Sequence, residues 1–102
     1  MYNILICDDE KDIRAALRIY LTNELYNLIE AENGRQAVEI ADSREIHLAL
    51  MDIMMPEMDG LEAMEKIREK HNFPILLLTA EISTRLSNSG ALIPRSASYL
   101  WM

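Results

Sequence analysis

Two groups of acidic residues directly follow apolar runs, and their spacing could support metal and phosphoryl chemistry. Asp8 and Asp9 follow the apolar residues 4–7, and Asp52 follows the apolar residues 48–51. If these two runs are adjacent parallel strands, three carboxylates meet at one end of a sheet. Such a cluster repels itself unless a cation binds between its oxygens, so the pattern predicts a divalent-metal site.

The composition predicts a single cytoplasmic domain. The chain has 102 residues, of which 50% are hydrophobic, enough for one compact core and too few for a second. Its net charge is -7, whereas proteins that bind nucleic acids usually have a basic surface. We therefore expect no direct nucleic-acid contact by this domain. No run is apolar enough for a membrane span and no signal peptide is recognisable, so we expect no membrane contact. The single cysteine, Cys7, lies in an apolar run and is expected to be a buried hydrophobe.

Short apolar runs alternate along the chain with segments of helical periodicity. We expect strands at residues 4–7, 26–31, 47–51 and 75–78. Asn33-Gly34 and Asp59 are expected to begin the second and third helices, whereas Arg14 and Arg18 of the first helix are expected on its solvated surface. The apolar residues at helical spacing are Ile13, Ala16, Leu17, Tyr20 and Leu21, then Ala37, Val38 and Ala41, then Leu61, Met64 and Ile67. Four strands alternating with three helices predict a doubly wound α/β sheet.

Three of the predicted strands are continuously apolar rather than alternating. This pattern is typical of central parallel strands that helices cover on both faces. Right-handed crossovers then place the carboxyl ends of all strands at one edge of the sheet, where ligands bind in such folds. The residues expected at that edge are Asp8, Asp9, Asp52 and Thr79.

Three segments share their order and spacing with a known family. They are Ile4-Leu-Ile-Cys-Asp-Asp-Glu10, Met51-Asp-Ile-Met-Met-Pro56 with Met58-Asp-Gly60, and Pro74-Ile-Leu-Leu-Leu-Thr-Ala80. In these segments the chain resembles the receiver domains of two-component response regulators. The resemblance implies a flavodoxin-like sheet of strand order 2-1-3-4-5 and a receiver core over residues 1–81.

The resemblance also implies a role for each residue of the acidic cluster. Asp52 would be the phosphoacceptor, whose carboxylate attacks phosphorus and forms an acyl phosphate. Asp8, Asp9, Asp52 and the backbone carbonyl of Met54 would bind Mg²⁺. The hydroxyl of Thr79 would hydrogen-bond the phosphoryl group and act as the conformational switch, although a plain helix cap is the alternative.

The implied function is signalling rather than enzymatic turnover. The partner would be a sensor histidine kinase, and the parent protein a DNA-binding transcriptional regulator, with homodimerisation as a further option. The domain would at most catalyse its own phosphorylation and dephosphorylation. One alternative is a Mg²⁺-dependent phosphohydrolase with an aspartyl nucleophile, but this needs a second acid where Met54 stands. The other is a non-phosphorylated interaction module, against which the intact acidic cluster argues.

Residues 82–102 depart from the family pattern. Receivers continue through a fifth strand, a lysine that reaches the phosphoryl oxygens and a last helix, whereas no lysine follows Lys70 here. We therefore expect the fifth strand and the last helix to be missing, which leaves residues 75–78 as an apolar edge that residues 97–101 could pair with. Codons exist for residues 83–90 that give Asp-Lys-Ile-Ile-Glu-Leu-Gly when the reading frame is moved one base earlier. This favours an out-of-frame tail over a divergent natural terminus.

Overall fold

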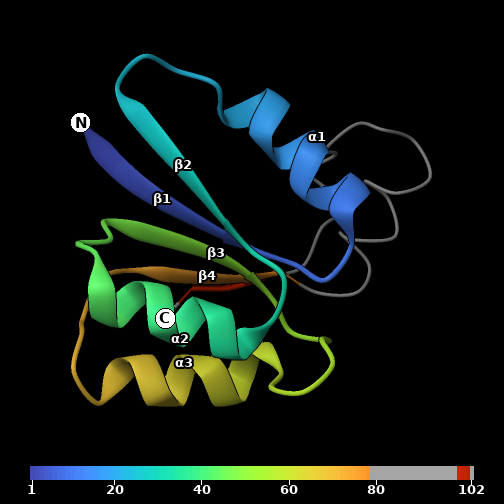
Figure 1. Ribbon diagram of the computed structural model, residues 1–102, viewed down its shortest axis with the longest axis vertical. Coiled ribbons are helices and arrows are strands. Elements are labelled where there is room, and N and C mark those ends of the chain that lie inside the picture. The colour runs from blue at the N-terminus through green and yellow to red at the C-terminus, as the bar shows by residue number, and fades with distance from the viewer. Residues whose placement is uncertain (79–98, 102) are drawn as a thin grey trace.

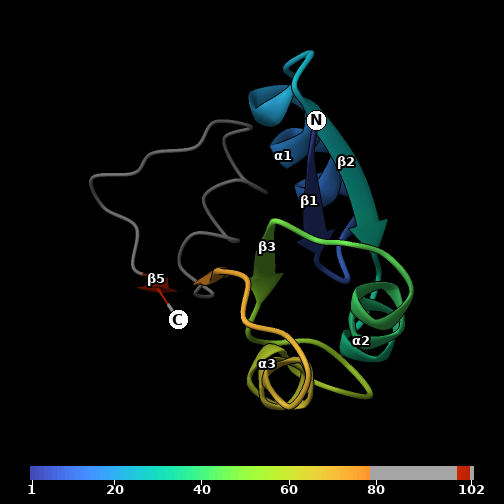
Figure 2. The ribbon, with the colours of Figure 1, turned by 90° about the vertical axis from the view of Figure 1, so that its left-hand side faces the viewer.

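The computed structural model describes residues 1–78 and 99–101, which form a sheet with helices on both faces (Figure 1). Helix α1 covers one face, and helices α2 and α3 cover the other (Figure 2). The elements are β1 (Tyr2–Cys7), α1 (Lys11–Leu21), β2 (Tyr26–Ala31), α2 (Gly34–Ser43), β3 (Leu48–Asp52), α3 (Gly60–Arg68), β4 (Ile75–Leu78) and β5 (Tyr99–Trp101). None of these described helices is long and apolar enough to cross a membrane.

The sheet confirms the flavodoxin-like order predicted from the sequence. Its strands are arranged β2-β1-β3-β4-β5, and the first four are parallel. In the register, Cys7 is paired with Met51 and Asp52 with Leu78. The carboxyl ends of β1, β3 and β4 therefore lie at one edge of the sheet, where the acidic residues follow.

The edge beyond β4 differs from the receiver pattern. Strand β5 pairs with β4 in the antiparallel direction, with Leu78 opposite Tyr99 and Leu76 opposite Trp101. Within residues 1–78 and 99–101 there is no parallel fifth strand, as expected, whereas the expectation about the last helix falls on residues outside this described part. Residues 97–101 were expected to be able to pair with the apolar β4 edge, and residues 99–101 do pair with it. Residues 79–98 and 102, which include Thr79 and most of the predicted tail, lie outside the described part of the chain.

Apolar side chains fill both faces of the sheet, as the continuously apolar strands predicted. On β1, Leu5 and Cys7 belong to the core under α2 and α3, whereas Ile6 belongs to the core under α1. The smaller α1 core also contains Ile13 and Leu17. Both clusters bury their members, and this burial holds the central strands between two helical layers.

Two predicted core positions proved to be exposed. Tyr20 is 49% exposed because the buried stripe of α1 runs through Ile13, Arg14 and Leu17, which leaves Tyr20 at its flank. Leu61 is 42% exposed, since α3 buries Gly60, Ala63, Met64 and Ile67 and Leu61 lies about 100° around the helix from Gly60.

Candidate functional site

Three carboxylates meet at the edge of the sheet, as the strand ends predicted. Each of Asp8, Asp9 and Asp52 offers a carboxylate oxygen, and these oxygens lie within 4.8 Å of one another. Their proximity follows from the pairing of β1 with β3, in which the last residues before the acids are register partners. Asp8 and Asp52 are buried, whereas Asp9 is exposed, so the cluster opens to solvent on one side.

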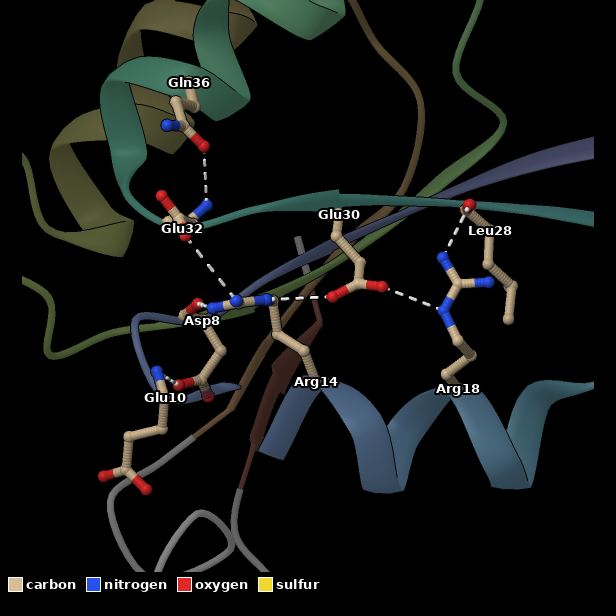
Figure 3. Close-up of polar contacts among 8 residues, drawn as sticks. All are labelled: Asp8, Glu10, Arg14, Arg18, Leu28, Glu30, Glu32 and Gln36. Carbon is tan, nitrogen blue, oxygen red and sulfur yellow. Dashed lines mark hydrogen bonds and ion pairs between the residues drawn. The ribbon is translucent and has the colours of Figure 1, made fainter. Parts of the chain in front are cut away.

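Asp8 is the most enclosed of the three acids. Its Oδ1 accepts a hydrogen bond of 2.8 Å from the backbone N–H of Glu10 (Figure 3), and its Oδ2 is buried with no hydrogen-bond partner in the described chain. Burial, reinforced by the charges of Asp52 and Asp9, raises the pKa of Asp8 to about 7. A buried carboxylate oxygen without a donor is a suitable ligand for a cation.

Asp52 is also held away from solvent. Its Oδ1 accepts a hydrogen bond of 3.2 Å from the N–H of Met54, and only 4% of the residue is exposed. Burial, together with the charges of Asp9 and Glu10, raises the pKa of Asp52 to about 6. Two buried carboxylates and one exposed carboxylate fit a hard divalent cation such as Mg²⁺, which binds oxygen ligands and retains several waters.

The raised pKa values predict how the stability of the metal-free protein changes with pH. In the unfolded chain an aspartate titrates near pH ~4, whereas the folded pKa of Asp8 is about 7 and that of Asp52 about 6. Between these values the folded state keeps protons that the unfolded state has released, so stability is lost as pH rises through this window. Asp8 contributes about two pK units of this change and Asp52 about one, so we expect the free energy of unfolding in EDTA to fall by about 4 kcal/mol between pH ~5 and ~8.

Urea denaturation at several pH values, in EDTA and in excess Mg²⁺, measures this effect. Mg²⁺ should oppose the loss, because it binds the ionised carboxylates. The Asp8→Asn variant is the matched control, since an amide cannot ionise, and its stability in EDTA should change less over the same range. A wild-type stability that is flat or rises across this window in EDTA would contradict the prediction.

The loop that follows Asp52 is packed against the start of α2. Gly34 donates its N–H to the carbonyl of Met58 at 3.1 Å, and a Cβ at Gly34 would lie 2.3 Å from that oxygen. Gly60 donates to the carbonyl of Ile53 at 2.9 Å, and its own Cβ would lie 2.2 Å from the carbonyl oxygen of Asp52. Both glycines are therefore required for space, because a side chain would collide with backbone atoms.

Side chains from α2 also hold this loop at Glu57. Glu57 has a φ of 64°, in the left-handed region that favours glycine. Its carboxylate accepts hydrogen bonds from Asn33 Nδ2 at 3.1 Å and from Arg35 Nη2 at 2.5 Å. Asn33 in addition caps α2 by accepting from the N–H of Gln36. These contacts, the Glu57 clamp, fix the loop beside Asp52, and the sequence analysis did not identify them.

Arg14 is a buried part of the site that the sequence analysis placed wrongly on the helix surface. It is 7% exposed, and its Nη1 donates a 2.6 Å hydrogen bond to the backbone carbonyl of Asp8 (Figure 3). Its Nε donates to Glu30 Oε1 at 2.9 Å, and Arg18 Nε donates to the other oxygen, Glu30 Oε2, at 2.8 Å. The spacing of Arg14 and Leu17 within the apolar stripe was a signal that could have revealed this burial.

The predicted roles of two further site residues, Met54 and Thr79, are not tested by the structure. Met54 lies in the loop after β3 and is 68% exposed, and its N–H donates to Asp52 Oδ1. Its backbone carbonyl remains a predicted ligand. Thr79 lies outside the described residues, so its role as a switch also stays a prediction.

Comparison with known proteins identifies the family. The model of the response regulator receiver domain matches residues 4–91, most of the chain and more than the core predicted from the sequence. The protein therefore belongs to the response regulator receiver family, the signalling domains of two-component phosphorelays.

Two similar curated proteins are named as regulatory proteins. The chain is 49% identical over 81 residues to the transcriptional regulatory protein YdfI of Bacillus subtilis, which covers 78% of this chain and 38% of that protein. It is 44% identical over 78 residues to the regulatory protein VanR of Enterococcus faecium, covering 76% of this chain and 34% of VanR. The chain thus spans little more than a third of the length of either relative.

Solved structures of similar fold include two with direct bearing on the site. Response regulator protein TrrA from Thermotoga maritima, in complex with Mg²⁺-BeF, is 40% identical with a TM-score of 0.73, covering 87% of this chain and 77% of that chain. A structure of histidine kinase ThkA in complex with TrrA matches at 42% identity and a TM-score of 0.72, covering 78% of this chain and 70% of that chain.

Proposed function

We propose that Asp52 is the phosphoacceptor of this receiver domain. An oxygen of its carboxylate attacks the phosphorus of a phosphohistidine in line, and an O–P bond forms as the P–N bond breaks. The electron pair of the broken bond remains on the imidazole nitrogen of the kinase. The observation that carries this proposal is the position of Asp52, which lies within 4.8 Å of the other two carboxylates at the carboxyl end of the sheet.

Asp8, Asp9 and Asp52 are proposed to bind Mg²⁺ together with the backbone carbonyl of Met54. The unpaired, buried Oδ2 of Asp8 supports this, because that atom has no donor in the described chain. When bound, Mg²⁺ offsets the repulsion among the carboxylates and neutralises charge on the transferring phosphoryl oxygens. The Met54 N–H meanwhile keeps Asp52 Oδ1 in a fixed orientation.

The proposed donor is a sensor histidine kinase, and the proposed sensor of the phosphoryl group is Thr79. The similarity to TrrA, which is known in complex with the histidine kinase ThkA, supports a kinase partner. Thr79 comes directly after Leu78, the residue of β4 that is paired with Asp52. We therefore expect its hydroxyl to hydrogen-bond the acyl phosphate. The domain would catalyse no more than its own phosphorylation and dephosphorylation.

The parent protein is proposed to be a cytoplasmic, DNA-binding transcriptional regulator, since both curated relatives described above are regulatory proteins. Its receiver core would occupy residues 1–81, and residues 82–102 would come from out-of-frame reading of the coding DNA. Codons incompatible with the shifted reading of residues 83–90 would contradict that origin. Binding DNA would require a further domain, because this one is acidic.

The test is phosphorylation by acetyl phosphate in Mg²⁺, followed by intact mass spectrometry. We expect the mass to increase by one phosphoryl group, and we expect EDTA to prevent the increase. Titration with beryllofluoride in Mg²⁺ is the second measurement, because this phosphoryl analogue binds aspartate without a transfer step. No response to either reagent would favour the alternative of a non-phosphorylated interaction module.

A further inference from the structure

We propose that Arg14 is a positioning residue for the metal site, since its guanidinium fixes the turn that presents Asp8 and Asp9. This inference rests on the proposed Mg²⁺ site. Arg14 does not contribute a ligand itself. It acts through the backbone carbonyl of Asp8, with which its Nη1 makes a buried hydrogen bond of 2.6 Å.

The turn between β1 and α1 is held by hydrogen bonds to both the side chain and the backbone carbonyl of Asp8. The side chain is fixed by the Glu10 N–H, which donates to Oδ1, and the main chain is fixed by Arg14, which donates to the carbonyl oxygen. The peptide that links Asp8 to Asp9 contains this carbonyl. Its orientation therefore influences the directions in which both carboxylates leave the chain.

The guanidinium of Arg14 is itself held in place by strand β2. Glu30 accepts from Arg14 through one carboxylate oxygen and from Arg18 through the other (Figure 3). Although burial opposes ionisation, the hydrogen bonds from Arg18 and Arg14 hold the pKa of Glu30 below its usual value. Glu32 adds a weaker ion pair with Arg14 Nη2 at 3.8 Å. A planar guanidinium that is held by two acceptors on β2 can fix the orientation of a third acceptor, here the carbonyl of Asp8. The single ammonium group of a lysine would do this less well.

Preorganisation explains why this arrangement affects cation binding. A flexible turn would lose conformational entropy when its carboxylates bind Mg²⁺, and it would bind the ion more weakly. The buried hydrogen bond from Arg14 already orders the turn in the metal-free protein, so less entropy is lost when the ion binds. Removing partners of this kind around metal ligands typically weakens affinity by about 10–100-fold.

The experiment compares the Mg²⁺ dissociation constants of three variants with that of the wild type by titration calorimetry. Arg14→Ala should weaken binding roughly 10-fold, and Arg14→Lys should recover part of the loss. Arg18→Ala is the matched control, because Arg18 shares the partner Glu30 and is one turn away on α1, yet its guanidinium donates to Glu30 and to the carbonyl of Leu28. Arg18→Ala should lower thermal stability while it leaves the dissociation constant within about twofold, as expected for a surface ion pair.

All titrations are done at a temperature at which circular dichroism shows each variant to be folded. If Arg14→Ala does not fold, Glu30→Ala replaces it, and this variant should also weaken Mg²⁺ binding because it removes the acceptor that holds the guanidinium. Wild-type protein that does not bind Mg²⁺ would overturn the proposed metal site itself. Wild-type binding with an unchanged constant in Arg14→Ala or its replacement, or equal weakening in Arg18→Ala, would overturn only the positioning role.

Discussion

The Asp52→Asn variant is expected to lose phosphorylation entirely, to the background of the assay. The amide keeps the size of the side chain, and its oxygen can still accept the hydrogen bond from the Met54 N–H, so the fold should be preserved. It lacks the carboxylate charge that attacks phosphorus, and loss of a nucleophile typically lowers a rate by factors of about 10⁴ or more. Intact mass spectrometry after reaction with acetyl phosphate and Mg²⁺ measures the loss.

The matched control is Asp59→Asn, which makes the same chemical change seven residues later in the sequence. Asp59 is exposed and caps α3 by accepting from the N–H of Glu62 at 2.8 Å. Asparagine caps helices about as well as aspartate, so this variant should be phosphorylated at the wild-type rate. Phosphorylation that persists in Asp52→Asn would place the nucleophile on another residue.

The second large effect is expected from Gly60→Ala, the smallest substitution possible at the start of α3. A Cβ there would lie 2.2 Å from the carbonyl oxygen of Asp52 and 3.0 Å from the Cα of Ile53. Both are backbone atoms, so the loop must shift rather than a side chain rotate. We expect the free energy of unfolding to fall by about 3 kcal/mol or more, a size typical of severe local clashes. Urea denaturation monitored by circular dichroism measures it.

Leu61→Ala provides the comparison for this variant, because it alters the next residue of the same helical turn. Leu61 is 42% exposed, and alanine favours the helix, so a loss below about 1 kcal/mol is expected. The displaced Asp52 should also make Gly60→Ala a poor phosphoacceptor, whereas Leu61→Ala should remain active. Equal stability of the two variants would show that the loop accommodates a side chain at residue 60.

The arrangement of the sheet and of the acidic cluster could be predicted because strands that are buried on both faces are continuously apolar in the sequence. Strands β1, β3 and β4 are apolar on both faces, and only a parallel sheet covered by two helical layers buries such strands. The polar residues at the ends of β1 and β3 then had to meet at one edge. Asp8, Asp9 and Asp52 came together for that reason.

The contacts that support the cluster were harder to predict, since most of them depend on partners distant in sequence. Only the place of Arg14 in the apolar stripe of α1 indicated its burial. Arginine is usually exposed, and burial of Arg14 is favourable because Glu30 on the neighbouring strand and the carbonyl of Asp8 both accept from its guanidinium. The left-handed backbone at Glu57 likewise follows from contacts with Asn33 and Arg35 rather than from local preference. The antiparallel direction of β5 had no local signal either.

The residues that form the Glu57 clamp and the Arg14 contacts all lie in the part of the chain that is synthesised first. Arg14, Glu30, Asn33 and Arg35 all precede Asp52, and Glu57 follows it by only five positions. A chain is synthesised from its N-terminus, and a domain folds as a unit. The side chains that hold both loops of the acidic cluster are therefore translated before β4 begins, and a change of reading frame after that strand leaves each of them in the protein.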